Sequence, residues 1–462
     1  RELRIWVVPI KVDGIIGTWG VGNASAVASQ LQRDIPNMLP LAASQLQVRT
    51  RPTLTVRSAT TFITSLGMLN RVAAELAAFR WLVSNHVAAP DFIVAVMPAG
   101  LVAGGEGASF AGRRRVLFVD EEHPDAAIHE LGHGVGLYID QEQYDKYPPN
   151  GALLGACTIF STESAGANEI KHLPSERHNW FEKWCAYYDF MGCANPVWSS
   201  TEAIGTFHKW FADNLTSAKP MVKAAPGTTA AMAALNSGAK RLLVSGMVSE
   251  RQPIPGTVRL FDLSRLDVAA EPLGGFGEYH FKAYDDGGVE IFSQPFIVQT
   301  AESEWVGTVD VPLATASCRI IKTYDNRLVP LDIGAAGLTR TKILSPALGD
   351  KVGKRLSITW QTSCDGVPEV DQVRHLLYFR TAANGEWESL VGPTTDLALE
   401  TYSDMLPETT TLELRLVTSD GIDSVEDIVT GITVLPRLPE VTILSPAAGA
   451  TSQTKTAYSR NQ

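Results

Sequence analysis

The first half of the chain alternates between two hydrophobic patterns. Four short β-branched runs bounded by Gly, Pro or Asp predict strands, at residues 4–11, 48–57, 91–97 and 115–119. Between them, apolar residues recur at spacings of three and four and predict amphipathic helices, at residues 23–35, 60–85, 124–137 and 201–214. Pro36 is expected to end the first of these helices. The pattern therefore predicts an α+β domain.

The hydrophobic pattern changes near residue 220. Residues 221–240 are rich in Ala, Gly, Pro, Ser and Thr and have no clear period, so they are predicted to be a linker. From residue 241 onward helix signals nearly vanish, and alternating strands are separated by turns such as the Asp-Asp-Gly-Gly of residues 285–288. Residues 241–338 are therefore predicted to form a β-sandwich module.

A repeated segment marks a second module of the same kind. The sequence Ile-Leu-Ser-Pro-Ala at residues 343–347 returns 100 residues later at 443–447. That period is the length of one β-sandwich, so we expect a module at 339–437 and a further repeat or a C-terminal tail at 438–462. In its opening ILSPA, its ITWQTSCDG and its RLVTSDG, the module at 339–437 resembles the fibronectin type III and immunoglobulin-like domains of extracellular bacterial proteins. The resemblance implies a secreted or cell-surface protein.

Composition and charge exclude several classes of protein. The chain has 39 Lys and Arg against 50 Asp and Glu, a net charge of −11, which argues against a nucleic-acid-binding protein. Hydrophobic residues make up 45% of the chain and charged residues 19%, which excludes a disordered chain. No apolar run reaches the roughly 18–20 residues of a membrane span. The sequence begins at Arg1, with neither an initiator Met nor a charged-then-apolar leader, so we expect that a signal or pro-segment was removed, or that the chain is cut from a longer one.

The segment His129-Glu130-Leu131-Gly132-His133 carries the strongest chemical signal. On a helix, residues four apart share one face, so His129 and His133 can direct two imidazoles at one metal ion. Glu130 lies about 100° round the helix, within reach of a water on that metal. Zinc polarises a carbonyl and activates water, and a carboxylate in this place serves as general base.

These residues resemble the zinc-dependent metallopeptidases called zincins, and more narrowly the metzincins. The metzincin motif continues with a glycine seven residues after the first His, where Gly136 stands, and a positive φ there would turn the chain back to the metal. Metzincins also have a Met-turn beneath the zinc, and Tyr-Asp-Phe-Met-Gly at 188–192, with Met191, is similar to it. The resemblance covers about residues 1–215 and implies a metzincin-like domain at 1–220 that holds Zn²⁺.

The third zinc ligand departs from the metzincin pattern. In that family it lies ten residues after the first His, and Ile139, which stands there, cannot ligate a metal. Asp140 follows, and a one-residue insertion in the turn would bring its carboxylate to the zinc. The spacing is similar to that of bacterial immunoglobulin-A-cleaving metallopeptidases, whose motif ends in an Asp-Glu pair. Glu142, His172 and His178 remain alternatives to Asp140.

The long segment from residue 141 to 184 is polar and rich in Tyr, Pro and Asn. Loops of this length are commonly functional, so it is expected to line one wall of the substrate cleft, with His178 able to hydrogen-bond a peptide. Some metzincins have a Tyr two residues after the Met that supports the transition state, but here that place holds Cys193. Tyr188 is therefore the candidate for stabilising the oxyanion.

Five cysteines are too few for a disulfide scaffold. Cys157, Cys185 and Cys193 lie around the expected cleft, and either one disulfide among them or three small buried side chains would fit the pattern. Cys318 and Cys364 fall in separate β-modules and are predicted to be free.

These observations together predict a secreted zinc metalloendopeptidase. His129, His133 and Asp140 would hold Zn²⁺, and Glu130 would act as general base on the peptide bonds of a protein or glycoprotein. The β-modules would contact a carbohydrate, a protein or a cell surface. Two alternatives remain: an adhesin or other binding protein with a peptidase-like scaffold, and a zinc exopeptidase.

Overall fold

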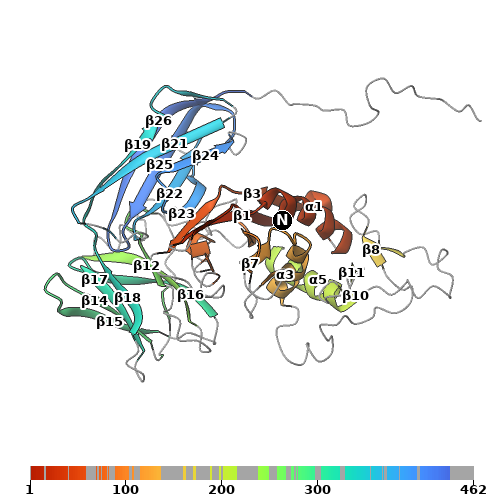
Figure 1. Cartoon of the computed structure of the whole chain (residues 1–462), viewed down its shortest axis with the longest axis horizontal. Coiled ribbons are helices and arrows are strands. Elements are labelled where there is room, and N and C mark those ends of the chain that lie inside the picture. Colours follow the sequence, from red (N-terminus) through yellow and green to blue (C-terminus); the bar gives the residue numbers. More distant parts are fainter. Residues whose placement is uncertain are drawn as a thin grey trace, which may run out of the picture.

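The protein is described by a computed structural model. The structure describes residues 2–14, 17–39, 41–58, 89–102, 115–136, 201–215, 238–248, 258–266, 279–296, 303–322, 328–353, 355–366, 372–383, 385–402 and 406–436, with shorter pieces between them. Three folded parts follow one another along the chain (Figure 1). We call them the N-terminal domain (its elements lie within residues 3–215), the first β-module (within residues 239–334) and the second β-module (within residues 338–434).

A mostly parallel sheet forms the centre of the N-terminal domain. Its strands are β1 (Leu3–Gly14), β2 (Gly17–Trp19), β3 (Leu46–Thr50), β4 (Leu54–Ser58), β5 (Phe92–Met97), β6 (Gly107–Ala108) and β7 (Val116–Asp120). Their spatial order is β2-β1-β5-β7-β6, and β3 and β4 also pair with the long β1. The pairs of β1 with β3, β4 and β5, and of β5 with β7, are parallel, whereas β2 and β6 are antiparallel edge strands.

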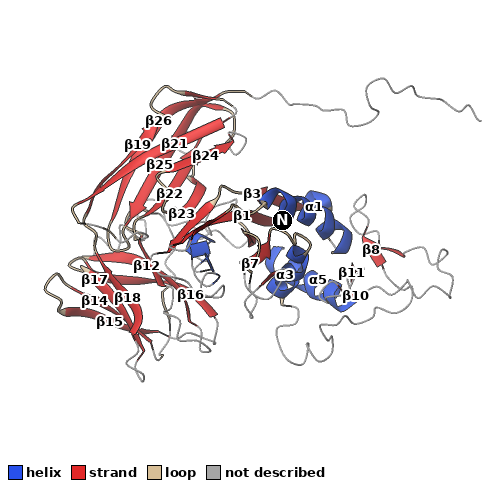
Figure 2. Ribbon diagram, in the orientation of Figure 1, coloured by secondary structure: helices blue, strands red, loops and turns tan. Residues whose placement is uncertain are grey.

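Helices cover both faces of this sheet (Figure 2). One face packs against α1 (Ala24–Met38), α3 (Ala126–Val135) and α5 (Thr201–Leu215). The other face packs against a helix whose described residues lie between 69 and 82. Because side chains alternate along a strand, Ile5 and Val7 enter the first core, and Trp6 and Val8 enter the second.

Several details of the N-terminal domain differ from the sequence-based expectation. The strand predicted at residues 48–57 is two strands, β3 and β4, which pair with successive parts of β1. A mostly parallel sheet with helices on both faces is an α/β arrangement, so the predicted α+β pattern is corrected in this respect. The first helix does begin at its expected cap, where Asn23 Oδ1 accepts the Ala26 N–H, but it continues past Pro36 to Met38. Pro36 removes one helical N–H in the last turn, and the Leu39 N–H still reaches the Ile35 carbonyl.

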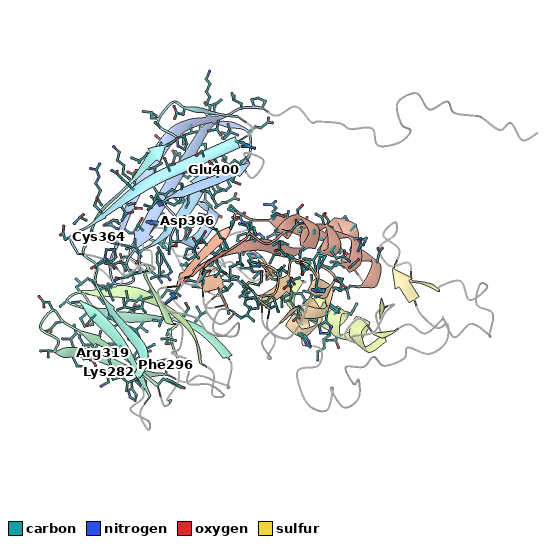
Figure 3. The ribbon with its side chains drawn as sticks, viewed as in Figure 1. Lys282, Phe296, Arg319, Cys364, Asp396 and Glu400 are labelled. Carbon is teal, nitrogen blue, oxygen red and sulfur yellow. The ribbon has the colours of Figure 1, made fainter. Side chains whose placement is uncertain are left out.

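The first β-module is a sandwich of two antiparallel sheets. Its strands are β12 (Ala239–Val248), β13 (Val258–Asp262), β14 (Tyr279–Tyr284), β15 (Glu290–Phe296), β16 (Ser303–Pro312), β17 (Ser317–Lys322) and β18 (Leu328–Gly334). The sheets have the orders β13-β12-β16 and β15-β14-β17-β18. They enclose one core that includes Phe281 and Phe296, which is labelled in Figure 3.

The second β-module is also a sandwich, with its first strand at the edge of a sheet. Its strands are β19 (Leu338–Ser345), β20 (Lys351–Val352), β21 (Arg355–Cys364), β22 (Arg374–Arg380), β23 (Glu388–Thr394), β24 (Ala398–Tyr402), β25 (Thr409–Ser419) and β26 (Ser424–Val434). The sheets have the orders β19-β21-β24 and β20-β26-β25-β22-β23, as in immunoglobulin-like sandwiches. The prediction of successive β-sandwich modules is confirmed.

The cysteines of the two modules are free, as predicted. Cys318 lies in the core of the first module, and Cys364 ends β21 of the second (Figure 3). Burial raises the pKa of the Cys318 thiol to about 12, so this thiol stays protonated and unreactive at neutral pH.

The two β-modules are docked closely against each other. The turn between β25 and β26 contains Gly421, whose φ of +103° favours glycine, and it places Ile422 inside the core of the first module. Ser424 Oγ of the second module donates a 2.7 Å hydrogen bond to Asp262 of the first. The Lys240 ammonium of the first module lies 2.8 Å from the Asp423 carboxylate of the second.

No helix in the described part of the chain is long and apolar enough to cross a membrane.

A buried histidine in the second module predicts acid sensitivity. His375 is 2% exposed, its Nδ1 lies 2.8 Å from Thr418 Oγ1, and burial lowers its pKa from 6.5 to about 3. Between these two values the unfolded chain binds a proton that the folded chain does not. Stability should therefore fall as the pH falls below 6.5, by up to about 1.4 kcal/mol per pH unit.

Denaturant unfolding of the unsubstituted protein and of His375→Gln between pH 7.5 and pH 4 measures this contribution. The two stability profiles should diverge below pH 6.5, with the unsubstituted protein losing stability more steeply. Parallel profiles would show that His375 does not titrate as its burial requires.

Candidate metal centre

The helix α3 carries the histidine motif and lies directly against the central sheet. It follows β7 after a short turn and begins at Ala126, with Asp125 as its N-cap, so Pro124 lies just before the helix rather than in its first turn. Ile128, Leu131 and Val135 are buried in the core between the sheet and the helices, as their spacing predicts. This apolar stripe fixes the rotation of the helix, so the polar positions of α3 are fixed as well.

His129 and His133 converge on one point, as their spacing predicts. Their Nε2 atoms are 3.1 Å apart, and their half-buried rings meet edge to face at 79°. Two imidazoles that bind one tetrahedral zinc ion at about 2.0–2.1 Å have nitrogens about 3.3 Å apart. The Nε2–Nε2 distance is therefore close to that of two imidazoles on one zinc ion, and it is also the distance of a hydrogen bond between the two rings.

Within α3, Glu130 is the single residue among Asp, Glu, Lys and Arg, and it is 4% exposed. A buried carboxylate is costly to keep in an ordinary helix, so its burial beside two histidines is consistent with a chemical role.

Gly136 ends α3 in the left-handed conformation that the motif requires. Its φ is +106°, and its N–H bonds to the carbonyls of Gly132 and His133. An L side chain at this φ would strain the backbone. The turn at Gly136 releases the chain from the helix immediately after the second histidine, which agrees with the expected turn.

An acidic turn before α3 ties three segments together, and sequence reasoning missed its role. Glu121 accepts the N–H groups of Asn23, at the start of α1, and of Ala99, after β5, at 2.9 and 3.1 Å. Asp120 accepts the Gly100 N–H at 2.7 Å. These bonds fix the carboxyl ends of β5 and β7 to each other and hold the entry to α3. The sequence feature that could have indicated this role is the Asp-Glu-Glu run at residues 120–122, directly after a predicted strand.

The short strand β6 forms the edge of the sheet beside α3. It pairs antiparallel with β7 and lies against α3. An edge strand offers backbone N–H and C=O groups to an extended peptide.

Most of the other predicted site residues lie outside the described residues. This is so for Asp140, Glu142, His178, Met191 and the three cysteines Cys157, Cys185 and Cys193. Tyr188 lies in β10 (Tyr188–Asp189), which pairs in parallel with β11 (Val197–Trp198), and His172 ends β9 (Ile170–His172), which pairs with β8 (Phe160–Thr162). The structure describes the backbone of these strands and not their side chains.

The described residues thus contain two of the three predicted ligands. Within them, no three His, Cys, Asp or Glu side chains form a group that could hold a metal ion. The assignment of the third ligand to Asp140 stays a prediction.

Comparisons with known proteins leave the family of the chain open. No protein-family model matches the chain, and no curated protein matches it. Among solved structures, it is similar to fibronectin(III)-like modules of Clostridium thermocellum CbhA, with 15% identity and a TM-score of 0.18, over 40% of this chain and 90% of that one.

Two chicken proteins give comparable matches. The first is the FN1-FN3 domains of CNTN1, with 11% identity and a TM-score of 0.17 over 38% of this chain and 61% of that one. The second is a two-domain fibronectin type III segment of tenascin, with 9% identity and a TM-score of 0.15 over 41% of this chain and 93% of that one. At these scores the matches assign no family, and the sandwich architecture rests on the strand order of the modules.

Proposed function

We propose that the N-terminal domain is a secreted zinc-dependent endopeptidase. One observation carries the proposal: the Nε2 atoms of His129 and His133 are 3.1 Å apart on a buried helix that ends in the left-handed Gly136. The buried Glu130 between the two histidines supports it. The edge strand β6 beside α3 supports an extended peptide as the substrate.

Each residue has a separate role in the proposed reaction. His129 and His133 hold the zinc ion, together with Asp140 as the proposed third ligand. When bound, zinc supplies a Lewis acid that polarises the scissile carbonyl and lowers the pKa of a water. Glu130 accepts the proton of the attacking water and passes it to the departing amine. Tyr188 donates a hydrogen bond to the oxyanion.

The β-modules would serve the same enzyme by binding. We propose that they contact a protein, a carbohydrate or a cell surface through their outer faces, so that the peptidase acts on protein or glycoprotein substrates there.

Removal of the Glu130 carboxylate tests the catalytic role. Glu130→Gln keeps the size of the side chain and removes its ability to accept a proton, so casein hydrolysis should fall by at least about 100-fold while zinc content is retained. Glu122→Gln is the matched control, because Glu122 is exposed on the turn before α3 and should keep full activity. Chelator should abolish hydrolysis, and added zinc should restore it.

Persistent activity in Glu130→Gln would contradict the role of Glu130. If the unsubstituted protein binds zinc but cleaves no protein, the chain is a binding protein on a peptidase-like scaffold. If only terminal residues are released, as end-group analysis would show, the enzyme is an exopeptidase.

The third ligand is tested by metal analysis. Asp140→Ala should leave the protein with substoichiometric zinc after dialysis, because two imidazoles alone hold the ion weakly, whereas Glu142→Ala should keep its zinc. Full zinc occupancy in Asp140→Ala would refute the assignment. Loss in Glu142→Ala would move it to Glu142, and retention in both variants would move it to His172 or His178.

A further inference from the structure

The three folded parts meet around one buried carboxylate. Glu75 lies on the helix between residues 69 and 82, on the face of the sheet opposite α3, and its side chain is 6% exposed. It is ion-paired with Arg259 of the first β-module and with Arg374 of the second. The three residues come from three different folded parts.

The geometry of both ion pairs is close. Arg374 donates two hydrogen bonds to the carboxylate of Glu75, from Nη2 to Oε1 at 2.6 Å and from Nε to Oε2 at 3.0 Å. Arg259 Nε lies 2.7 Å from Oε1. Bidentate guanidinium–carboxylate bonds of this kind are directional, so they fix orientation as well as distance.

Apolar side chains from all three parts lie beside the ion pairs. They form one buried cluster, made of Ala78, Leu82, Leu243, Phe261, Leu263, Leu266, Leu376, Tyr378 and Val417. The two arginine side chains are 16% and 7% exposed. In this setting removal of the Glu75 carboxylate leaves two buried arginine side chains without this partner, and removal of either arginine leaves Glu75 with one of its two guanidinium groups.

We infer that Glu75 is a latch that fixes both β-modules to the N-terminal domain as one rigid particle. The carboxylate is satisfied by both guanidinium groups in one arrangement of the three parts, and a shift of either module breaks a buried charged hydrogen bond. The latch goes beyond the proposed peptidase activity and does not rest on it, because it lies on the sheet face opposite α3.

Further contacts between the N-terminal domain and the second module agree with a fixed arrangement. Arg51 stacks over Trp6 at 4.2 Å and donates from Nη2 to the carbonyls of Ser389 and Leu390 in β23, at 2.6 and 2.9 Å. Gly392 in the same strand lies so close to Phe79 that a Cβ there would be 2.5 Å from the ring. β4 and β23 lie side by side at this contact.

The latch can be tested on the full chain by cutting the linker. A site for a sequence-specific protease is inserted between Gly227 and Thr228, inside the segment predicted to be a linker. After cutting, size-exclusion chromatography at decreasing concentration measures how tightly the N-terminal fragment and the two-module fragment stay together. The fragments of the otherwise unsubstituted protein should elute as one particle, since the docking contacts do not depend on the linker.

Glu75→Gln should weaken this association at least tenfold in the dissociation constant. Glu413→Gln is the matched control: Glu413 forms a similarly buried ion pair with Arg380, but both residues belong to the second module. This control should leave the association unchanged. Near-ultraviolet circular dichroism before cutting checks that each variant is folded. The zinc content of Glu75→Gln should equal that of the unsubstituted protein, so a failure of the latch can be told apart from a failure of the proposed peptidase site.

The inference is overturned if the fragments of the unsubstituted chain separate, or if those of Glu75→Gln hold together as tightly as those of Glu413→Gln. If Glu75→Gln does not fold, Arg374→Gln carries the same test from the side of the second module, because it removes the bidentate partner and leaves Arg259 in place. Unchanged association in a folded Arg374→Gln would also overturn the inference.

Discussion

Burial of the central parallel sheet on both faces is the constraint on which the rest of the structure depends. Every residue of β5 and of β7 is buried, so neither face can be left to water. The helices α1, α3 and α5 cover one face, and the helix between residues 69 and 82 covers the other. The first covering layer supports the candidate metal centre, and the second meets the β-modules.

The position of the two histidines follows from this covering. Helix α3 must direct Ile128, Leu131 and Val135 at the sheet, and its rotation then leaves His129 and His133 half-buried on another side. Because they are four residues apart, their rings meet without any strain in the helix. Asp120 and Glu121, in the turn before α3, accept hydrogen bonds from the segments after β5 and before α1. These bonds hold the start of α3, and with it the imidazole pair, in a fixed position relative to the sheet.

Features that depend on neighbours in the sequence could be predicted, and features that depend on distant partners could not. The helix of the histidine motif, the left-handed Gly136 and the β-modules all follow from local period or local backbone demands. Glu75 gave no such signal, because a single Glu in an amphipathic helix usually faces water, and its partners lie 184 and 299 residues away. Ile422 likewise belongs by sequence to one module and by packing to the core of another.

The ion pairs at Glu75 explain how the three parts are oriented better than they explain how strongly the parts attract one another. Replacing a buried ion pair by apolar side chains is commonly neutral or stabilising, so the attraction between the parts is assigned to the apolar cluster around Leu243 and Leu376 rather than to the charges. Apolar faces alone, however, fit together in several registers. A carboxylate that needs two guanidinium groups from two modules favours one register, since every other leaves a charge buried without its partner. The module surfaces open to a ligand are then those that face away from this junction.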